Sequence, residues 1–171
     1  SAGAAALIYQ YFTNTMGKAP SPAMMKAMLV AGARMVNPAL YKFPIYGAEP
    51  EIVHQGWGAV DIDRAVEGPR LQASADVLWL DQDDTSPLNT SQAYSRSYTV
   101  EEGDGGFKVA LVWTDPAGYP ASAVALVNDL DLVVVAPDGS SYVGNLFDLD
   151  GLSSYPFPST ETNGWDSYNN V

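Results

Sequence analysis

Apolar residues recur at helical spacing near the start of the chain. The spacing i, i+3, i+4, i+7 predicts a helix over residues 2–16, and Gly17 is a plausible stop for it. The apolar stripe of this helix comprises Ala4, Leu7, Ile8 and Tyr11, widened by Ala5 and Phe12. A helix that is apolar on nearly every side is predicted to be buried, and its small residues allow another backbone to approach closely.

A second helix is predicted to begin at Ser21-Pro22, with Ser21 as the N-cap and Pro22 in the first helical position. Its apolar stripe comprises Met24, Met28, Ala31 and Met35. Such a methionine-rich stripe could form a binding groove, but packing in the core is the favoured interpretation. Asn37-Pro38 is predicted to end this helix, because the residue before a proline avoids the helical conformation. A short third helix is predicted from a cap at Asp61.

Beyond residue 69 the pattern changes to the alternation of strands. Strands are predicted at residues 76–80, 93–100, 107–113, 130–136 and 141–143. Residues 107–113 are apolar on both faces, which is typical of a strand inside a sandwich. Pro137-Asp138-Gly139 predicts a hairpin turn. The predicted fold class is therefore α+β, with helices followed by an antiparallel β-sandwich or jelly roll.

Charge divides the chain near the same point. The formal net charge is −12, yet only two of the eight cationic residues, Arg96 and Lys108, follow residue 70. We therefore predict two domains, one at residues 1–68 and a β-rich one at residues 69–171. The acidic second part repels phosphate and predicts no nucleic-acid partner. No apolar run approaches the roughly 18 residues of a membrane span, so no membrane partner is predicted. The absence of cysteine excludes disulfides and thiolate metal sites.

Motifs that carry catalysis or bind phosphate are absent from the sequence. It contains no Gly-rich phosphate loop, no His-Glu-x-x-His zinc motif and no Gly-x-Ser-x-Gly nucleophile turn. The single histidine, His54, has no nucleophile motif beside it and is interpreted as a loop residue near Trp57. No catalytic residue is therefore predicted within this chain.

Several segments, taken in order, resemble the subtilisin-like serine proteases. Residues 1–8, Ser-Ala-Gly-Ala-Ala-Ala-Leu-Ile, are similar to the helix that follows the catalytic serine of a Gly-Thr-Ser-Met-Ala-x-Pro motif. The Pro-Ser-Pro-Ala at residues 20–23 opens a segment similar to the family's next helix, and Gln-Gly-Trp-Gly-Ala-Val-Asp at 55–61 resembles the end of its catalytic domain. Four later segments resemble the jelly-roll domain of one bacterial-type branch, namely residues 109–116, 126–132, 136–139 and 165–171.

The resemblance implies a secreted, extracellular serine endopeptidase that hydrolyses polypeptide substrates with a Ser-His-Asp triad. The triad would lie upstream of Ser1, and the serine roughly two helical turns before it, so this chain alone is expected to be inactive. Residues 1–68 would be the terminal helices of a subtilisin-like α/β domain, and their partner would be the remainder of that domain. The accessory β domain would be truncated at Val171. Helices without the sheet they normally cover should expose an apolar face or pair with another chain.

Paired carboxylates suggest a structural calcium site. Asp129 and Asp131 are two residues apart in a predicted strand, so they point to one face, roughly 6–7 Å apart. Their repulsion is about 2.5 kcal/mol at an effective dielectric near 20, and about 0.6 kcal/mol in open water. Partial enclosure would favour a calcium ion, to which Asp148 and Asp150 could contribute. The alternative is solvated acids on a soluble surface. That interpretation is preferred for the linker acids Asp81, Asp83 and Asp84.

A different class of function also fits the sequence. The chain could be a non-catalytic β-sandwich module that binds carbohydrate or protein, with aromatic residues as platforms. The candidates for such platforms are Trp79, Trp113, Trp165 and several tyrosines. Aromatic residues in alternating strands are more often part of the core, so a buried Trp113 would count against this alternative and an exposed coplanar row would favour it.

Overall fold

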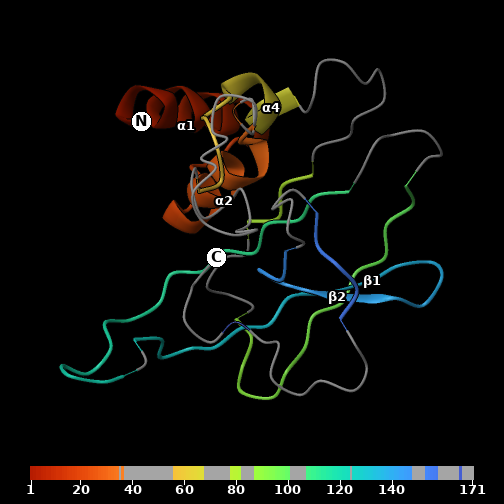
Figure 1. Ribbon diagram of the computed structural model, residues 1–171. Helices are drawn as coiled ribbons and strands as arrows, with labels where there is room; N and C mark the ends of the chain where they lie inside the picture. Colours follow the sequence, from red (N-terminus) through yellow and green to blue (C-terminus); the bar gives the residue numbers. More distant parts are fainter. Residues whose placement is uncertain are drawn as a thin grey trace, which may run out of the picture. The chain divides into compact units, whose positions relative to one another are not determined.

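The computed structural model divides the chain into two compact units. The helical unit consists of Ser1–Gly32 with Val60–Ala110, and the second unit consists of Ala33–Ala59 with Leu111–Val171. The residues that the structure describes are 1–34, 36, 56–67, 78–81, 87–100, 107–123, 125–147, 153–157 and 166. These residues form α1 (Ala2–Met16), α2 (Pro22–Gly32), α4 (Ile62–Glu67), β1 (Val133–Val135) and β2 (Ser141–Val143) (Figure 1). None of the described helices is long and apolar enough to span a membrane.

Helix α1 occupies the predicted residues and ends at the predicted glycine. Gly17 adopts the left-handed conformation, with φ 69° and ψ 9°, and its N–H donates to the carbonyl of Thr13 at 2.9 Å. Glycine takes this conformation without the steric penalty of a Cβ. The prediction of a helix over residues 2–16 is confirmed.

Helix α2 begins as predicted but ends earlier. The Ser21 hydroxyl accepts a hydrogen bond from the Met24 N–H at 3.0 Å, which confirms Ser21 as the N-cap. The helix ends at Gly32 rather than near Asn37-Pro38. Arg34 and Ala59 exchange backbone hydrogen bonds of 3.0 and 2.8 Å, so the Arg34 N–H is engaged outside the helix. This β-bridge directs the backbone away from the helix after Gly32, and no local sequence pattern predicts it.

Helix α4 crosses α2 at a glycine. Asp61 caps α4 by accepting a hydrogen bond from the Arg64 N–H at 3.1 Å, which confirms the predicted cap. A Cβ built on Gly32 would lie 2.5 Å from the Cα of Ala65. Because a real Cβ does not approach backbone so closely, Gly32 permits this crossing.

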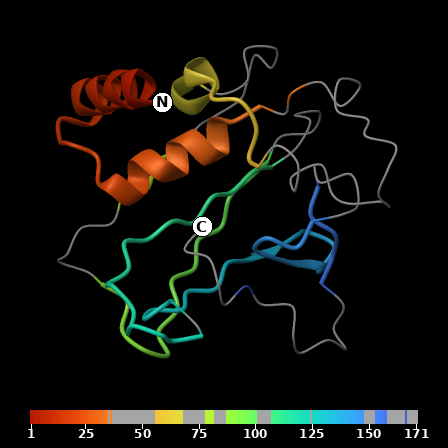
Figure 2. The same ribbon diagram turned by 60° about the vertical axis from the view of Figure 1, so that its left-hand side comes forward.

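The three helices share one apolar core. Figure 2 shows α1, α2 and α4 packed together. Their buried side chains form a cluster of Ile8, Phe12, Met24, Met28, Ala65 and Val66. Ile8 and Phe12 expose no surface, and burial of side chains of this size stabilises a fold by about 1.5–3 kcal/mol each. The core interpretation of the methionine stripe is confirmed for Met24 and Met28, whereas Ala31 is exposed.

Strands β1 and β2 form the predicted hairpin. They pair antiparallel, with Val133 opposite Val143 and Val135 opposite Ser141. At the turn, Gly139 has φ 88° and its N–H donates to the carbonyl of Ala136 at 2.9 Å. The Ser140 N–H donates to Oδ1 of Asp138 at 2.8 Å. The Pro-Asp-Gly signal therefore identified the turn correctly, although β1 is shorter than the predicted 130–136.

The predicted β-sandwich or jelly roll is wrong. The described residues contain one two-stranded sheet, and residues 93–100 and 107–113 lie outside its strands. Exposure reaches 65% for Tyr94, 56% for Val100 and 50% for Phe107, so their alternation does not bury one face. Alternation shows only that a segment suits a pleated surface; a strand also needs a hydrogen-bonded neighbour. The domain boundary predicted between residues 68 and 69 lies outside the described residues and stays a prediction.

Candidate functional site

Helix α1 has one buried face and one uncovered face. Ile8 and Phe12 are fully buried, whereas Leu7 is 55% exposed and Tyr9 is 45% exposed. A Cβ built on Gly3 would meet no described atom within 4 Å, so no described part of the chain packs closely against this position of α1. The prediction of a helix buried on nearly every side is wrong. Large apolar side chains are exposed on both flanks of the buried face, and an uncovered apolar face of the helices stays a prediction.

Trp79 completes the buried side of α1. Its ring centroid lies 6.0 Å from that of Tyr11, with the planes inclined by 78°, and 6.0 Å from that of Phe12, with an inclination of 59°. The arrangement of Trp79 and Tyr11 is edge to face, which is favoured between aromatic rings, and that of Trp79 and Phe12 is tilted. Trp79 therefore belongs to the helical core and is not an aromatic platform for a ligand. Among the described atoms, its buried indole Nε1 has no hydrogen-bond acceptor.

Asp81, two residues further along, holds the start of α2. Its Oδ2 accepts a hydrogen bond from the Ser21 N–H at 2.7 Å, and its Oδ1 accepts one from the Ser21 hydroxyl at 2.6 Å. The Lys18 ammonium donates to the backbone carbonyl of Asp81 at 3.4 Å. The interpretation of Asp81 as a solvated linker acid is wrong, because its partners lie some 60 residues away in sequence. Asp83 and Asp84 lie outside the described residues.

Lys108 holds the other end of α2. Its Nζ donates to the carbonyl of Val30 at 3.0 Å. Partial burial lowers the pKa of Lys108, and the positive charge of Arg64 lowers it further. The sequence does not indicate this contact, because nothing in the neighbours of Lys108 points to a helix some 80 residues earlier.

In the second unit, the carboxylate of Asp115 connects two of the segments that resemble the protease family. Asp115 accepts hydrogen bonds from the Val127 N–H at 2.7 Å and from the Asn128 N–H at 2.9 Å. It also accepts one from the Asn128 side-chain amide at 2.8 Å. The Val127 N–H, more than the Asn128 groups, holds the pKa of Asp115 below its ordinary value. The Trp113 indole N–H donates to the Asn128 carbonyl at 3.0 Å, so residues 113–115 are fastened to residues 127–128.

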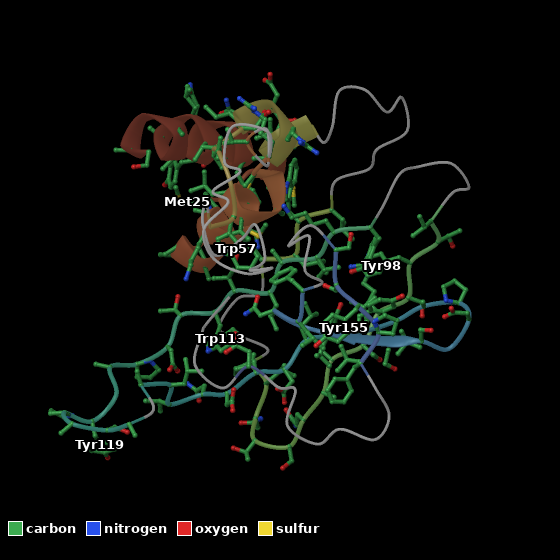
Figure 3. The ribbon with its side chains drawn as sticks, viewed as in Figure 1. Met25, Trp57, Tyr98, Trp113, Tyr119 and Tyr155 are labelled. Carbon is green, nitrogen blue, oxygen red and sulfur yellow. The ribbon has the colours of Figure 1, made fainter. Side chains whose placement is uncertain are left out.

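Two further contacts connect distant parts of the second unit. The Asn145 side-chain amide donates to the carboxylate of Asp166. The rings of Trp57 and Phe147 meet edge to face, with centroids 5.8 Å apart and planes inclined by 72°. Trp57, labelled in Figure 3, thus ties the Gly-Trp-Gly tripeptide to the segment that follows the hairpin. His54, next to this tripeptide, lies outside the described residues.

The predicted calcium ligands are only partly described. Asp129 and Asp131 are exposed and lie outside the strands, while Asp148 and Asp150 fall outside the described residues. Partial burial, followed by the negative charge of Asp129, raises the pKa of Asp131. The described part of the chain contains no group of three or more acidic, histidine or cysteine side chains placed to hold a metal. Two carboxylates fall well short of the six to eight oxygen ligands that calcium takes, so calcium at Asp129 and Asp131 stays a prediction.

The aromatic residues do not form a flat platform in the described structure. Trp113 is partly buried and its indole N–H is engaged, and Trp165 lies outside the described residues. The rings of Tyr98 and Phe107 are 5.9 Å apart, but their planes are inclined by 44°. Tyr119 is 88% exposed at the outer end of a loop (Figure 3). These observations weigh against the carbohydrate-binding alternative.

Comparison with known proteins gives a distant relationship to a serine protease. No protein-family model matches the chain. The chain is 27% identical, over an alignment of 180 residues, to the serine protease/ABC transporter B family protein tagA of Dictyostelium discoideum. The alignment covers 98% of this chain but only 9% of the Dictyostelium protein. The chain therefore corresponds to a small part of a much longer relative whose name includes a serine protease.

Proposed function

We propose that this chain is a supporting section of a subtilisin-like serine endopeptidase. In this proposal the Ser-His-Asp residues that cleave the peptide bond lie in other parts of the protein. Helix α1 is the helix that follows the catalytic serine, and α2 and α4 hold α1 in position.

The observation that carries the proposal is the extent of the similarity to the Dictyostelium protein. The match includes nearly the whole chain, helices and second unit alike, rather than one short motif. The order of the family-like segments in the sequence gives further support. So does the resemblance of Ser1–Ile8 to the helix after the nucleophile, since α1 forms over these residues.

The two faces of α1 give this helix a physical role. The buried face, with Ile8 and Phe12, fixes α1 against α2, α4 and Trp79. The uncovered face, bordered on its two edges by Leu7 and Tyr9, remains available to pack under the sheet of a catalytic domain. Displacement of a nucleophile by about 1 Å can cost roughly a hundredfold in rate. A rigidly held helix would therefore matter to catalysis without donating a catalytic group.

The proposal extends to the intact enzyme. It would act on polypeptides outside the cell, and the partner of the helical unit would be the remainder of its own catalytic domain. A structural calcium ion in the second unit, with Asp129 and Asp131 among its ligands, is part of the same proposal.

Active-site labelling tests where the nucleophile lies. The full-length gene product and the 171-residue chain are each treated with a fluorophosphonate, and the modified serine is located by mass spectrometry. We expect the full-length product to be labelled on one serine outside these residues, and the 171-residue chain to be neither labelled nor active on peptide substrates. A heat-denatured sample is the control for non-specific reaction. Activity-dependent labelling of any serine between Ser1 and Val171 would overturn the proposal.

A further inference from the structure

Both ends of α2 are held by residues from much later in the sequence. A helix leaves backbone N–H groups at its start and carbonyl groups at its end without helical partners. At the start, the carboxylate of Asp81 accepts hydrogen bonds from the N–H and the hydroxyl of Ser21, at 2.7 and 2.6 Å. At the end, the Val30 carbonyl accepts a hydrogen bond from Nζ of Lys108 at 3.0 Å.

The acceptor at the end of α2 is available because the helix stops there. In a continued helix the N–H of Arg34 would bond to the carbonyl of Val30. The Arg34 N–H instead donates to Ala59 at 3.0 Å, within the β-bridge. The Val30 carbonyl then accepts from Lys108, which satisfies a group that a half-buried helix end would otherwise leave exposed to water or unbonded.

The charges at the two ends have the favourable signs. A helix carries partial positive charge at its N-terminus and partial negative charge at its C-terminus, so a carboxylate suits the first and an ammonium the second. Asp81 and Lys108 match this arrangement. Lys108 is also one of only two cations beyond residue 70, so this contact uses half of the positive charge in that part of the sequence.

The segment that carries Asp81 also reaches α1. Trp79 and Asp81 are two residues apart, and in an extended backbone alternate side chains point to the same side. Trp79 packs against Tyr11 and Phe12 of α1, while Leu78 and Leu80 are 53% and 48% exposed. One short segment thus contacts α1 with its tryptophan and the start of α2 with its aspartate.

We propose that Trp79, Asp81 and Lys108 form an intrachain clasp, and that the surface made by α1 and both ends of α2 is the binding site for residues 78–81 and Lys108 of this same chain. The three helices and these residues then remain associated when the chain is cut between residues 70 and 71. The inference does not depend on the proposed protease function, since it concerns only how the chain holds itself together.

The test is a chain that can be cut between its two parts. A recognition sequence for a site-specific protease, flanked by Gly-Ser linkers, is inserted between Arg70 and Leu71. The uncut protein is checked for helical circular dichroism and then cleaved. The two pieces are analysed by size-exclusion chromatography, and their dissociation constant is measured by fluorescence anisotropy. We expect the cut pieces to elute together.

The clasp variants decide which contacts are responsible. The double variant Asp81→Asn, Lys108→Met should raise the dissociation constant by about tenfold or more, because both contacts are hydrogen bonds to charged groups. Asp129→Asn, an exposed acid of the second unit, is the matched control and should leave the constant unchanged. If the double variant loses its helical signal before cleavage, the single variant Lys108→Met, at a partly exposed side chain, takes its place. Separation of the unsubstituted pieces, or an unchanged constant in the variant that folds, would overturn the proposal.

Discussion

The helical unit and the second unit keep their order by different means. In the helical unit, Ile8, Phe12 and Met28 are almost completely buried and belong to one apolar cluster. Among the described residues of 111–147, Val143 is the side chain that reaches a comparable burial, at 5% exposure. There the contacts include hydrogen bonds to the carboxylates of Asp115 and Asp138, beside the β1–β2 pairing and the Trp113 indole bond.

From this difference we expect the two units to respond differently to acid and to the loss of side-chain volume. Burial of apolar area does not depend on the protonation of a side chain, so the helical core should withstand acid and be sensitive to the loss of side-chain volume. A loop held by a carboxylate loses its acceptor when that carboxylate is protonated. The loop held by Asp115 should therefore loosen in acid before the packing of α1 does, and the second unit should tolerate changes of apolar volume better.

Removal of the Phe12 ring from the helical core should have the largest effect on the free energy of unfolding. Phe12→Ala is expected to destabilise the chain by about 3–5 kcal/mol, because the fully buried side chain leaves a cavity. Tyr9→Ala, on the exposed side of the same helix, is the matched control and should cost much less. Urea unfolding followed by circular dichroism at 222 nm measures both. Similar losses in the two variants would show that α1 has no preferred buried face.

The crossing of α2 and α4 offers a test of close packing. Gly32→Ala should cost about 1–3 kcal/mol, since the new Cβ would lie 2.5 Å from backbone Cα of Ala65 and the helices would have to separate. Gly3→Ala in α1 meets no described atom and should stabilise the chain by up to about 1 kcal/mol. Thermal melting of the two variants compares them directly. A stabilising effect of Gly32→Ala would contradict the described crossing.

Loss of the Asp115 carboxylate should loosen the second unit without affecting the helices. In Asp115→Ala the amides of Val127 and Asn128 lose their acceptor, so their hydrogen exchange should accelerate several-fold while α1 amides are unchanged. The pKa of Asp115 is lowered in the folded state, so its contribution is present above the ordinary aspartate pKa and is lost as pH falls through the lowered value. Two-dimensional NMR across acid pH follows these amides. Faster exchange of α1 at the same pH would remove the contrast between the units.

The smallest effect is expected at Asp131. The pKa of Asp131 is raised, so its ionised form is disfavoured in the folded state and stability should rise slightly as pH falls through that pKa. Asp131→Asn mimics the protonated form and should therefore change stability at neutral pH by no more than a few tenths of a kcal/mol, in the stabilising direction. Asp129→Asn is the matched comparison, and thermal melting in a calcium-free buffer measures both.

Thermal melting of the unsubstituted chain and of Asp131→Asn also tests whether calcium binds. Millimolar calcium is expected to raise the melting midpoint of the unsubstituted chain, because an ion that binds only the folded state stabilises it. The Asp131→Asn variant should show a smaller rise. An unchanged midpoint in the unsubstituted chain would end the calcium proposal.

Local chemistry explains which elements could be predicted from the sequence. Ser21 as a cap, Gly17 as a stop and the Pro-Asp-Gly turn at 137–139 all act within a few residues, so their consequences are visible in the sequence itself. The strands at 93–100 and 107–113 were not found, because a strand exists only with a partner and alternation does not specify one. Asp81 and Lys108 were missed for the same reason, since their partners Ser21 and Val30 are distant in the sequence.

The most direct test of the central claim uses Leu7, which lies on the uncovered face of α1. If this face supports the catalytic domain, Leu7→Gln should change the unfolding free energy of the 171-residue chain by no more than about 0.5 kcal/mol. In the full-length gene product the same substitution should lower kcat towards a peptide substrate by roughly a hundredfold, with little change in KM. An unchanged kcat in the full-length product would contradict the role of α1 as the support of the nucleophile.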